Sequence, residues 1–312
     1  MRIVFWISAA LIVYTYAGFP LLLRVLARLR PKPVRKATYQ PAVTVLLAVH
    51  NEERVLEEKL HNMFNRYEYP QELLQFVIVS DGSNDGTNPI LRSVTDPRAR
   101  VLIRDQREGK AAAITAGMQV ATGELVMFTD ARQVVDPGAL RILASNFADP
   151  IIGCVSGSLH FRQGEGPLHG EVMKMDMENR IRELEGITGS TVGVLGALYA
   201  ARRELLKPVP RGTILDDCYT PLSIVHQGYR CVLDNDAKAW DRIALTPKQE
   251  FNRKVRTITG LYQLMRLLPW LVNPFNSMFW RFFSHKICRL LLPFAHAALL
   301  VSAALCAGGF YH

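Results

Sequence analysis

Residues 77–87 read VIVSDGSNDGT, an apolar run that stops at Asp81 and continues into small and polar residues. A simple turn is one interpretation, because Asp and Asn bond to their own backbone in turns and glycine supplies positive φ. The position of Asp81 favours a second interpretation. The apolar run is typical of a buried strand, so Asp81 falls where that strand ends and its carboxylate can accept hydrogen bonds from a ligand.

The residues around this stretch alternate between two patterns. A continuous apolar run typical of a strand buried on both faces occurs at residues 43–49. Further strands are predicted at residues 76–80 and 125–129, and a weaker one at 100–104, which has Arg at both ends. Helical patterns occur between them, at residues 52–67 and 110–121. Strands that alternate with helices predict an α/β fold with a doubly wound, mostly parallel sheet.

Polar residues follow each predicted strand, at residues 50–52, 81–87 and 105–110 and at Asp130. In a doubly wound sheet, ligands bind beyond the carboxyl ends of the strands. Asp81 and Asp130 are then two acids at two strand ends. If one of these acids contacts a nucleoside and the other holds a divalent cation, the pair would suit a nucleoside diphosphate ligand.

The two ends of the chain are more apolar than its middle. The 312 residues are 49% hydrophobic, with a mean hydropathy of +0.08. Residues 3–23 carry no charge, and residues 290–312 contain no Lys, Arg, Asp or Glu. About 20 apolar residues suffice to cross a bilayer as a helix. We therefore expect a membrane-spanning helix at each end, with a cleaved signal peptide as the alternative for the first.

Basic residues follow the first apolar run and precede the second. The net charge is +9. Lys286 and Arg289 precede the last run, and six basic residues with no acid among them follow the first: Arg24, Arg28, Arg30, Lys32, Arg35 and Lys36. The positive-inside rule predicts that residues 24–289 are cytosolic and that both termini face outward. The charge suits anionic membrane lipid or a phosphorylated ligand. Nucleic acid is not expected, because no basic stripe is interleaved with aromatics.

Seven segments, in order, resemble one family. They are VTVLLAVHNEE, VIVSDGSNDGT, REGKAAAITAG, VMFTDA, GALYAARRELL, ILDDCYTPLSIVHQGYR and EFNRKVRTITG, over about residues 43–260. The chain resembles the membrane-bound, processive family 2 glycosyltransferases, which include the cellulose, hyaluronan and poly-N-acetylglucosamine synthases. The resemblance implies a GT-A-type, Rossmann-like sheet with flanking transmembrane helices, in a bacterial-type inner or plasma membrane.

The composition of the chain and the resemblance together predict its division into domains. A transmembrane helix at residues 1–27 is followed by a basic linker at 28–41 and a cytosolic GT-A domain at 42–260. An interfacial amphipathic segment at 261–285 and a second transmembrane helix at 286–312 complete it.

The family motifs assign roles to particular residues. Asp217 would be the catalytic base, as the second acid of a pair with Asp216, and Asp130 would hold Mg²⁺ or Mn²⁺ as the first acid of a D-x-D motif. The expected donor-binding residues are Asn51, Glu52, Asp81, Asp85, Lys110, Arg253 and Arg256.

The sequence departs from the family pattern at two of these motifs. Arg132 stands where the second acid of D-x-D is expected, and Thr257 follows Arg256 where the family has Trp. Arg132 could neutralise phosphate directly, or Asp130 could hold the metal with phosphate oxygens and water. Simpler interpretations stay open for single sites: Lys110 as a solvated helix residue, Asp216 and Asp217 as a helix cap, and the residue 253–256 cluster as a contact to anionic lipid.

The resemblance implies an inverting glycosyltransferase that moves sugar from a UDP-sugar to a growing polysaccharide. Two alternatives stay open. One is a single transfer to a lipid-linked acceptor, which would form a glycolipid. The other is a catalytically inactive membrane scaffold in a polysaccharide export complex. Expected partners are the UDP-sugar, a glycan or lipid-linked acceptor, membrane lipid and other export subunits.

Overall fold

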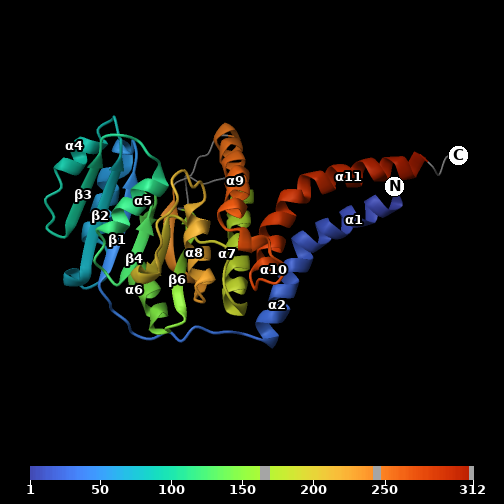
Figure 1. Ribbon diagram of the computed structural model, residues 1–312, viewed down its shortest axis with the longest axis horizontal. Helices are drawn as coiled ribbons and strands as arrows, with labels where there is room; N and C mark the ends of the chain where they lie inside the picture. Colours follow the sequence, from blue (N-terminus) through green and yellow to red (C-terminus); the bar gives the residue numbers. More distant parts are fainter. Residues whose placement is uncertain (162–168, 242–246, 309–312) are drawn as a thin grey trace. The chain divides into compact units, whose positions relative to one another are not determined.

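The computed structural model of the chain describes residues 1–161, 169–241 and 247–308 (Figure 1). The chain divides into two compact units. One is Lys32–Leu264, and the other combines Met1–Pro31 with Met265–His312. The larger unit contains the predicted α/β domain. The domain boundaries expected from the sequence stay a prediction.

The larger unit is built on one eight-stranded sheet with the order β3-β2-β1-β4-β7-β6-β8-β5. The strands are β1 Val43–Val49, β2 Leu74–Asp81, β3 Ala99–Arg104, β4 Leu125–Thr129, β5 Val134–Val135, β6 Ile152–Phe161, β7 Leu198–Arg202 and β8 Arg230–Asp241. The four strands predicted from apolar runs are all present, and β1 and β4 have the predicted bounds. The predicted α/β fold class is therefore confirmed.

The two halves of the sheet differ in strand direction. β1 pairs in parallel with β2 and with β4, and β2 pairs in parallel with β3. β7 is antiparallel to both β4 and β6, while β8 is parallel to β6 and antiparallel to β5. The first half is the doubly wound part, and the second half makes the sheet mixed.

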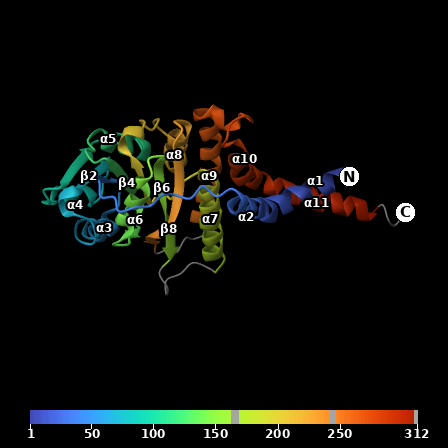
Figure 2. The same cartoon turned by 90° about the horizontal axis from the view of Figure 1, so that it is seen from below.

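Helices cover both faces of the sheet (Figure 2). Val45 and Leu47 pack with α3 (Glu53–Asn65) and α6 (Ala139–Ser145) in one core. Leu46, from the alternate face of β1, packs with α5 (Lys110–Gln119) and α8 (Asp216–His226) in a second core. Strand side chains point to opposite faces in turn, which is why one continuous apolar strand fills two cores.

Three further helices are α4 Thr87–Arg92, α7 His169–Thr188 and α9 Pro247–Leu267, the last of which ends three residues beyond the larger unit. The 3-10 turns are Gln71–Leu73, Asn146–Ala148, Arg203–Leu205 and Pro269–Val272. The segment predicted as an interfacial helix at 261–285 is divided. α9 ends at Leu267, and a 3-10 turn begins at Pro269, whose ring lacks the N–H that a helix needs.

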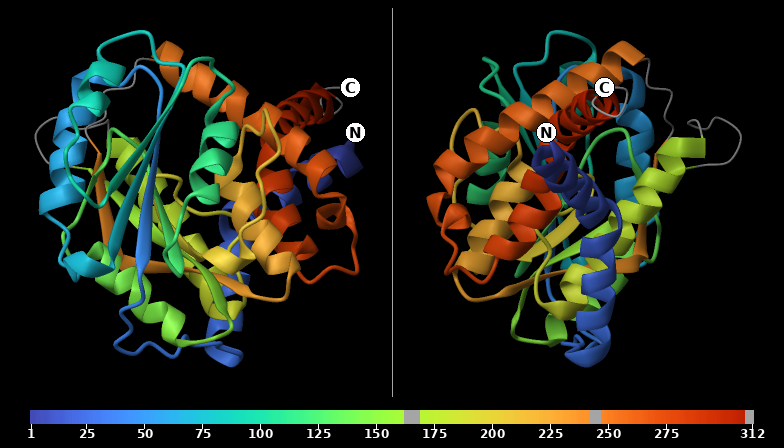
Figure 3. Two further views of the ribbon diagram at one scale, coloured as in Figure 1. Left: turned by 60° about the vertical axis from the view of Figure 1, so that its left-hand side comes forward. Right: turned by 90° about the vertical axis from the view of Figure 1, so that its right-hand side faces the viewer.

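Residues 32–41 form a strap, by which we mean an extended segment bonded along the larger unit. It lies at the end of the sheet where β1 begins (Figure 3). The backbone N–H of Lys32 donates to the carbonyl of Ile187 at 2.7 Å, and that of Ala37 donates to the carbonyl of Ser145 at 3.3 Å. The part of the predicted basic linker from Lys32 onward is therefore held by the larger unit, while its first two residues belong to α2 (Phe19–Leu29).

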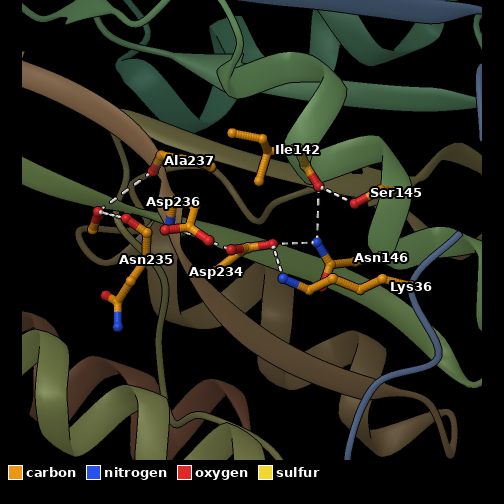
Figure 4. Close-up of polar contacts among 9 residues, drawn as sticks. Lys36, Ile142, Ser145, Asn146, Asp234, Asn235, Asp236 and Ala237 are labelled. Atoms are coloured by element: carbon orange, nitrogen blue, oxygen red, sulfur yellow. Dashed lines mark hydrogen bonds and ion pairs between the residues drawn. The ribbon is translucent and has the colours of Figure 1, made fainter. Parts of the chain in front are cut away.

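A buried carboxylate fixes the middle of the strap (Figure 4). Asp234 is 4% exposed, and its Oδ2 accepts from Lys36 Nζ at 2.7 Å and from Asn146 Nδ2 at 2.6 Å. Asn146 Nδ2 also donates to the carbonyl of Ile142 at 2.9 Å. Lys36 thus forms an ion pair with the buried carboxylate of Asp234.

The smaller unit consists of helices from both ends of the chain. α1 (Arg2–Val13) packs beside α11 (Cys288–Gly308), and α2 (Phe19–Leu29) and α10 (Phe279–Phe282) complete the unit. π-helical turns at Tyr14–Gly18 and Phe283–Ile287 join them into two longer helices. By length and composition, Arg2–Leu29 and Phe279–Cys306 could each cross a membrane. The last four residues of the predicted second span lie outside the described part.

Candidate active site

The site is built where four parallel strands end. The parallel registers of β1, β2, β3 and β4 bring the loops after these strands to one edge of the sheet. These loops carry Asn51 and Glu52, Asp81 and Asp85, Lys110, and Asp130. The sequence placed these polar residues at one sheet edge, and the strand registers confirm it.

Hydrogen bonds join the loops after β1 and β2. Asn51 Nδ2 donates to Asn84 Oδ1 at 2.8 Å, and the backbone N–H of Asn84 donates to Asn51 Oδ1 at 2.9 Å. Asn51 has a φ of 55°, in the left-handed region that Asn tolerates better than most residues. The backbone N–H of Glu52 donates to Thr87 Oγ1 at 2.9 Å. The two loops therefore form one wall.

The carboxylate of Asp85 lies within this wall. Its Oδ1 accepts from the backbone N–H of Thr87 at 2.9 Å, and its Oδ2 accepts from that of Glu53 at 3.3 Å. The side chain of Glu53 also bonds to this loop, since its Oε2 accepts from the backbone N–H of Gly86 at 2.7 Å. These are the turn and helix-start contacts of the simpler interpretation. A contact between Asp85 and a donor stays a prediction.

Asp81 holds the loop that follows β3. It is 2% exposed, and its two oxygens accept from the backbone N–H of Glu108 at 3.0 Å and of Gly109 at 2.6 Å. Arg104 NH1 lies 3.4 Å from Oδ1. Gly109 has a φ of 92°, which glycine adopts without strain. Asp81 thereby fixes the residue before Lys110, and its predicted contact with a nucleoside stays a prediction.

Lys110 lies between two acids from different elements. Its Nζ is 2.7 Å from Asp130 Oδ1 and 3.6 Å from Asp216 Oδ2. Burial disfavours the charged ammonium, but Asp130 and then Asp216 outweigh burial and raise the pKa of Lys110. Lys110 therefore stays a cation and is held in an ion pair, with 33% of its side chain exposed. Its predicted contact with a nucleotide stays a prediction.

Asp216 and Asp217 begin α8 but have different surroundings. Asp216 is 4% exposed, and its Oδ2 makes no hydrogen bond within the described residues. Burial raises the pKa of Asp216 to about 6; Lys110 opposes this increase, and Asp217 adds to it. Asp217 is half-buried. Of the two acids, Asp217 is the more accessible to an acceptor.

A glycine leaves open the space between Asp217 and Asp130. A methyl group on Gly196 would lie 3.8 Å from Asp217 Oδ2 and 3.9 Å from Asp130 Oδ2. A cavity of about 10 Å³, roughly one water molecule in size, also borders Gly196, and its charged lining residues are Lys110, Asp130 and Asp216. Gly196 therefore keeps two carboxylates facing the same open space.

This arrangement fits a divalent cation with one protein carboxylate. The described residues contain no cluster of three or more His, Cys, Asp or Glu side chains that could hold a metal. Mg²⁺ is often bound by one or two carboxylates together with substrate phosphates and water. Lys110 occupies one oxygen of Asp130, while the other faces the space beside Gly196. Asp130 could thus contribute one ligand to a cation whose other ligands come from a diphosphate.

Arg132 adds positive charge at the mouth of the site. Its side chain is exposed. Burial raises the pKa of Glu52, and the charge of Arg132 opposes this effect while that of Asp130 adds to it. The charges of Arg132 and Asp130 therefore both act on Glu52.

Arg253 and Arg256 lie on a different element, α9, with exposed side chains. α9 contacts the loop before Asp216, where Gln263 Oε1 accepts from the backbone N–H of Ile214 at 2.9 Å and Nε2 donates to the carbonyl of Gly212 at 2.8 Å. The structure thus connects α9 to the acidic pair, but a contact between either arginine and a diphosphate stays a prediction.

Two residues of this region were not singled out from the sequence. Gly196 lies in a stretch that was only described as glycine-rich. Lys59 lies on the apolar face of α3, three residues after Leu56, and is 1% exposed. The signal for Lys59 was a charged residue at an apolar helical position.

The fold and the acidic, cation-lined strand ends define the glycosyltransferase class of the GT-A fold. Residues 44–207, over half of the chain, match the family model described as glycosyl transferase family 2. The chain belongs to this family.

Curated relatives match much of the chain. The poly-beta-1,6-N-acetyl-D-glucosamine synthase of Staphylococcus aureus is 24% identical over 246 residues, which cover 76% of this chain and 58% of the synthase. The uncharacterized glycosyltransferase YaiP of Escherichia coli is 25% identical over 268 residues, which cover 82% of this chain and 65% of YaiP. The chain thus spans about three fifths of the length of these relatives.

Solved structures match the fold. A mannosyltransferase from Pyrobaculum calidifontis, in complex with GDP-Man and Mn²⁺, is 28% identical with a TM-score of 0.77, and the match covers 99% of this chain and 91% of that one. TarS of Staphylococcus aureus in complex with UDP-GlcNAc is 16% identical with a TM-score of 0.53, covering 79% of this chain and 71% of that one. The TarS match supports the fold alone.

Proposed function

We propose that the chain is an inverting glycosyltransferase that moves a sugar from a nucleoside-diphosphate sugar to an acceptor hydroxyl at a membrane. The observation that carries this proposal is the open space beside Gly196, which Asp217 and Asp130 face from two sides while Lys110 bonds to Asp130. A base, a cation and a carboxylate for a metal are the groups that such a transfer requires.

Asp217 takes the proton of the acceptor hydroxyl as that oxygen attacks the anomeric carbon. The new bond forms on the face opposite the leaving group, so a single displacement inverts the configuration. The bond between the anomeric carbon and the diphosphate oxygen breaks with its electron pair, and the diphosphate leaves. Lys110 and Arg132 stabilise the growing negative charge. Arg253 and Arg256 have the same role, because guanidinium groups bind phosphate oxygens with two fixed donors.

A divalent cation, when bound by Asp130 and the diphosphate, supplies further neutralisation of the leaving group. The remaining work belongs to side chains of this protein. Asn51, Glu52 and the backbone held by Asp81 and Asp85 form the wall toward the nucleoside.

The donor we propose is a UDP-sugar, with GDP-mannose as the second candidate. The poly-N-acetylglucosamine synthases are relatives over three quarters of this chain, and the resemblance to processive synthases implies UDP. GDP-mannose is favoured by a separate observation, the match to the Pyrobaculum mannosyltransferase along 99% of this chain. The two donors differ in base and sugar but share the diphosphate that the acidic and basic side chains would bind.

We propose a growing polysaccharide as the acceptor, with a lipid-linked acceptor as the alternative. Surface features of α9 support a location at the membrane. Four apolar side chains at helical spacing are exposed on it: Phe251, Val255, Ile258 and Tyr262. An apolar helical stripe beside basic residues suits the headgroup region of a bilayer. The terminal spans and their basic flanks support an integral membrane protein whose catalytic domain is cytosolic. Other subunits would then form part of any export path.

The experiment is incubation of membranes containing the full chain with a panel of UDP-sugars and GDP-mannose, with Mn²⁺ or with EDTA. Released nucleotide and the labelled product are both measured. Polymer supports the synthase, and a one-sugar lipid supports the alternative. Asp217→Asn membranes are the control for other transferases. A chain that binds nucleotide but releases none with any donor would support the inactive scaffold.

A further inference from the structure

α3 carries a lysine that is shut away from water. Lys59 is 1% exposed and is among the largest fully buried side chains of the described residues. It lies one helical turn from Leu56 and Met63, which are both buried in the same core. A lone ammonium is costly to bury, so an apolar side chain would suit this position better unless the amine has a task.

The ammonium bonds to both sides of the turn that carries Asp130 and Arg132. Lys59 Nζ donates to Thr129 Oγ1 at 2.6 Å and to the carbonyl of Gln133 at 2.8 Å. Thr129 is the last residue of β4, and Gln133 directly precedes β5. One side chain from a neighbouring helix therefore fixes the two ends of a turn of three residues.

The same contacts reach the residue beside Gly196. Thr129 Oγ1, which accepts from Lys59, donates to the carbonyl of Ala197 at 3.1 Å. Gln133 is held from its other end as well, because its Nε2 donates to Asp241 Oδ2 at 2.7 Å. Lys59 is thus connected to both segments that border the open space between Asp130 and Asp217.

The two hydrogen-bond acceptors of Lys59 Nζ, a hydroxyl and a carbonyl oxygen, are uncharged, although a buried lysine is usually paired with a carboxylate. Burial lowers the pKa of Lys59 to about 7, while the nearby charge of Asp130 opposes the decrease. Buried lysines with altered pKa values are more frequent at functional sites than elsewhere. The geometry of the two hydrogen bonds identifies the part of the protein that Lys59 serves, which is the Asp130–Arg132 turn.

We propose that Lys59 is a positioning residue that holds the Asp130–Arg132 turn in the geometry that binds a nucleoside diphosphate with its cation. This inference rests on the proposed function, because it takes Asp130 and Arg132 to act on the diphosphate. Lys59 itself touches neither ligand. It acts through Thr129 and Gln133.

The test compares Lys59→Met with Asn62→Leu in the full chain. Methionine keeps the length of the side chain and removes both hydrogen bonds. Asn62 is a matched control from the next turn of α3, where it donates from Nδ2 to the carbonyl of Val135 at 2.9 Å and accepts the N–H of Val135 at 3.0 Å. Both residues bind the segment after β4, but only Lys59 brackets the turn.

Two readouts are needed. The first is the rise in melting temperature when Mn²⁺ and UDP, or Mn²⁺ and GDP, are added to purified protein. The second is the Mn²⁺ concentration that gives half-maximal release of nucleotide from the active donor. Residues that orient metal-binding groups from behind typically change metal affinity about 10- to 100-fold. We expect Lys59→Met to need at least about 10-fold more Mn²⁺ in both assays, with an unliganded melting temperature close to that of the wild type. Asn62→Leu should lower that temperature without changing the Mn²⁺ dependence.

The inference is overturned if Lys59→Met keeps the wild-type Mn²⁺ dependence, or if it loses only melting temperature as Asn62→Leu does. Thr129→Val removes the hydroxyl through which Lys59 acts and must shift the Mn²⁺ dependence in the same direction, even if Lys59→Met fails to fold. A wild type that binds Mn²⁺ and nucleotide but transfers no sugar would refute the proposed function. The ligand-induced rise in melting temperature would then still test the role of Lys59. A wild type that binds neither nucleotide with Mn²⁺ would refute both.

Discussion

Replacing Gly196 by alanine should leave the protein folded and stop most of its catalysis. The new methyl group would lie 3.5 Å from Cβ of Asp217, 3.8 Å from its Oδ2 and 3.9 Å from Oδ2 of Asp130. These are ordinary van der Waals distances, and the φ of Gly196 is not positive, so alanine is compatible with the fold. Such Gly→Ala changes stabilise by about 0.4–1 kcal/mol, chiefly through the unfolded state.

The substitution should instead lower the rate of the reaction. The methyl group fills the space that both carboxylates face, so acceptor and donor must shift by about the radius of an atom. A displacement near 1 Å can cost about 100-fold in rate, which corresponds to about 2.7 kcal/mol of transition-state stabilisation. We expect Gly196→Ala to lower kcat/KM for nucleotide release by about this factor, with an unchanged or slightly raised Tm.

A matched control exists in α7. A methyl group on Gly186 would meet Leu233 N and Val232 Cα at 3.4 Å, again at ordinary contact distance but away from the acidic pair. Gly186→Ala should keep both Tm and kcat/KM. Wild-type kcat/KM in Gly196→Ala would refute our assignment of the open space as the reaction site. A large fall in its Tm would refute the claim that alanine fits.

Three other substitutions test single residues of the site. Asp217→Asn should lower the rate of sugar transfer by about 10²–10⁴-fold, the usual worth of general-base assistance, while calorimetry still detects nucleotide binding. Asp216→Asn should be more stable than the wild type at about pH 8 and equal to it below about pH 3, as measured by urea denaturation. The reason is that the pKa of Asp216 is about 6 in the folded protein, above its ordinary value of 3.8. The wild type is therefore most stable below pH 3.8, and its stability falls as the pH rises through 6. At 1.36 kcal/mol per pKa unit, the loss is about 3 kcal/mol. Asp81→Asn can accept only one of the N–H groups of Glu108 and Gly109, so its Tm should fall by the equivalent of about 1–3 kcal/mol for the orphaned donor; an unchanged Tm would contradict this role.

The first half of the fold could be predicted because its strands are continuous apolar runs. β1 and β4 have the predicted bounds, since both are buried on two faces and end at a polar residue. The long strand β8 is harder to detect. Its sequence RCVLDNDAKAWD has a turn-like DND in the middle, yet the strand continues through it with an irregular register beside β6. The direction of β7 was also not predictable, because a strand has the same side-chain pattern in either direction.

The site was predicted where its residues follow strands, and missed where it depends on contacts between distant elements. Asp130 and Lys110 were found from their positions after β4 and β3. The ion pair between them, at 2.7 Å, joins residues 20 positions apart that no local pattern connects. The apolar membrane stripe was expected at 261–285, where composition is rich in aromatics. The structure exposes apolar side chains within this segment, at Tyr262 and Phe275, and also before it, at Phe251, because exposure depends on what packs against a helix. The membrane contact itself stays a prediction.

The strap has a practical consequence for anyone who wishes to express the catalytic unit alone. A fragment that begins at residue 42, just before β1, would leave the buried carboxylate of Asp234 without Lys36. It would also lack the carbonyl of Pro41, to which Tyr69 Oη donates at 2.7 Å. Unpaired buried charges and donors favour unfolding and precipitation. A fragment that begins at Lys32 retains both contacts. The ten residues that look dispensable by composition therefore belong in any soluble fragment made for crystallisation.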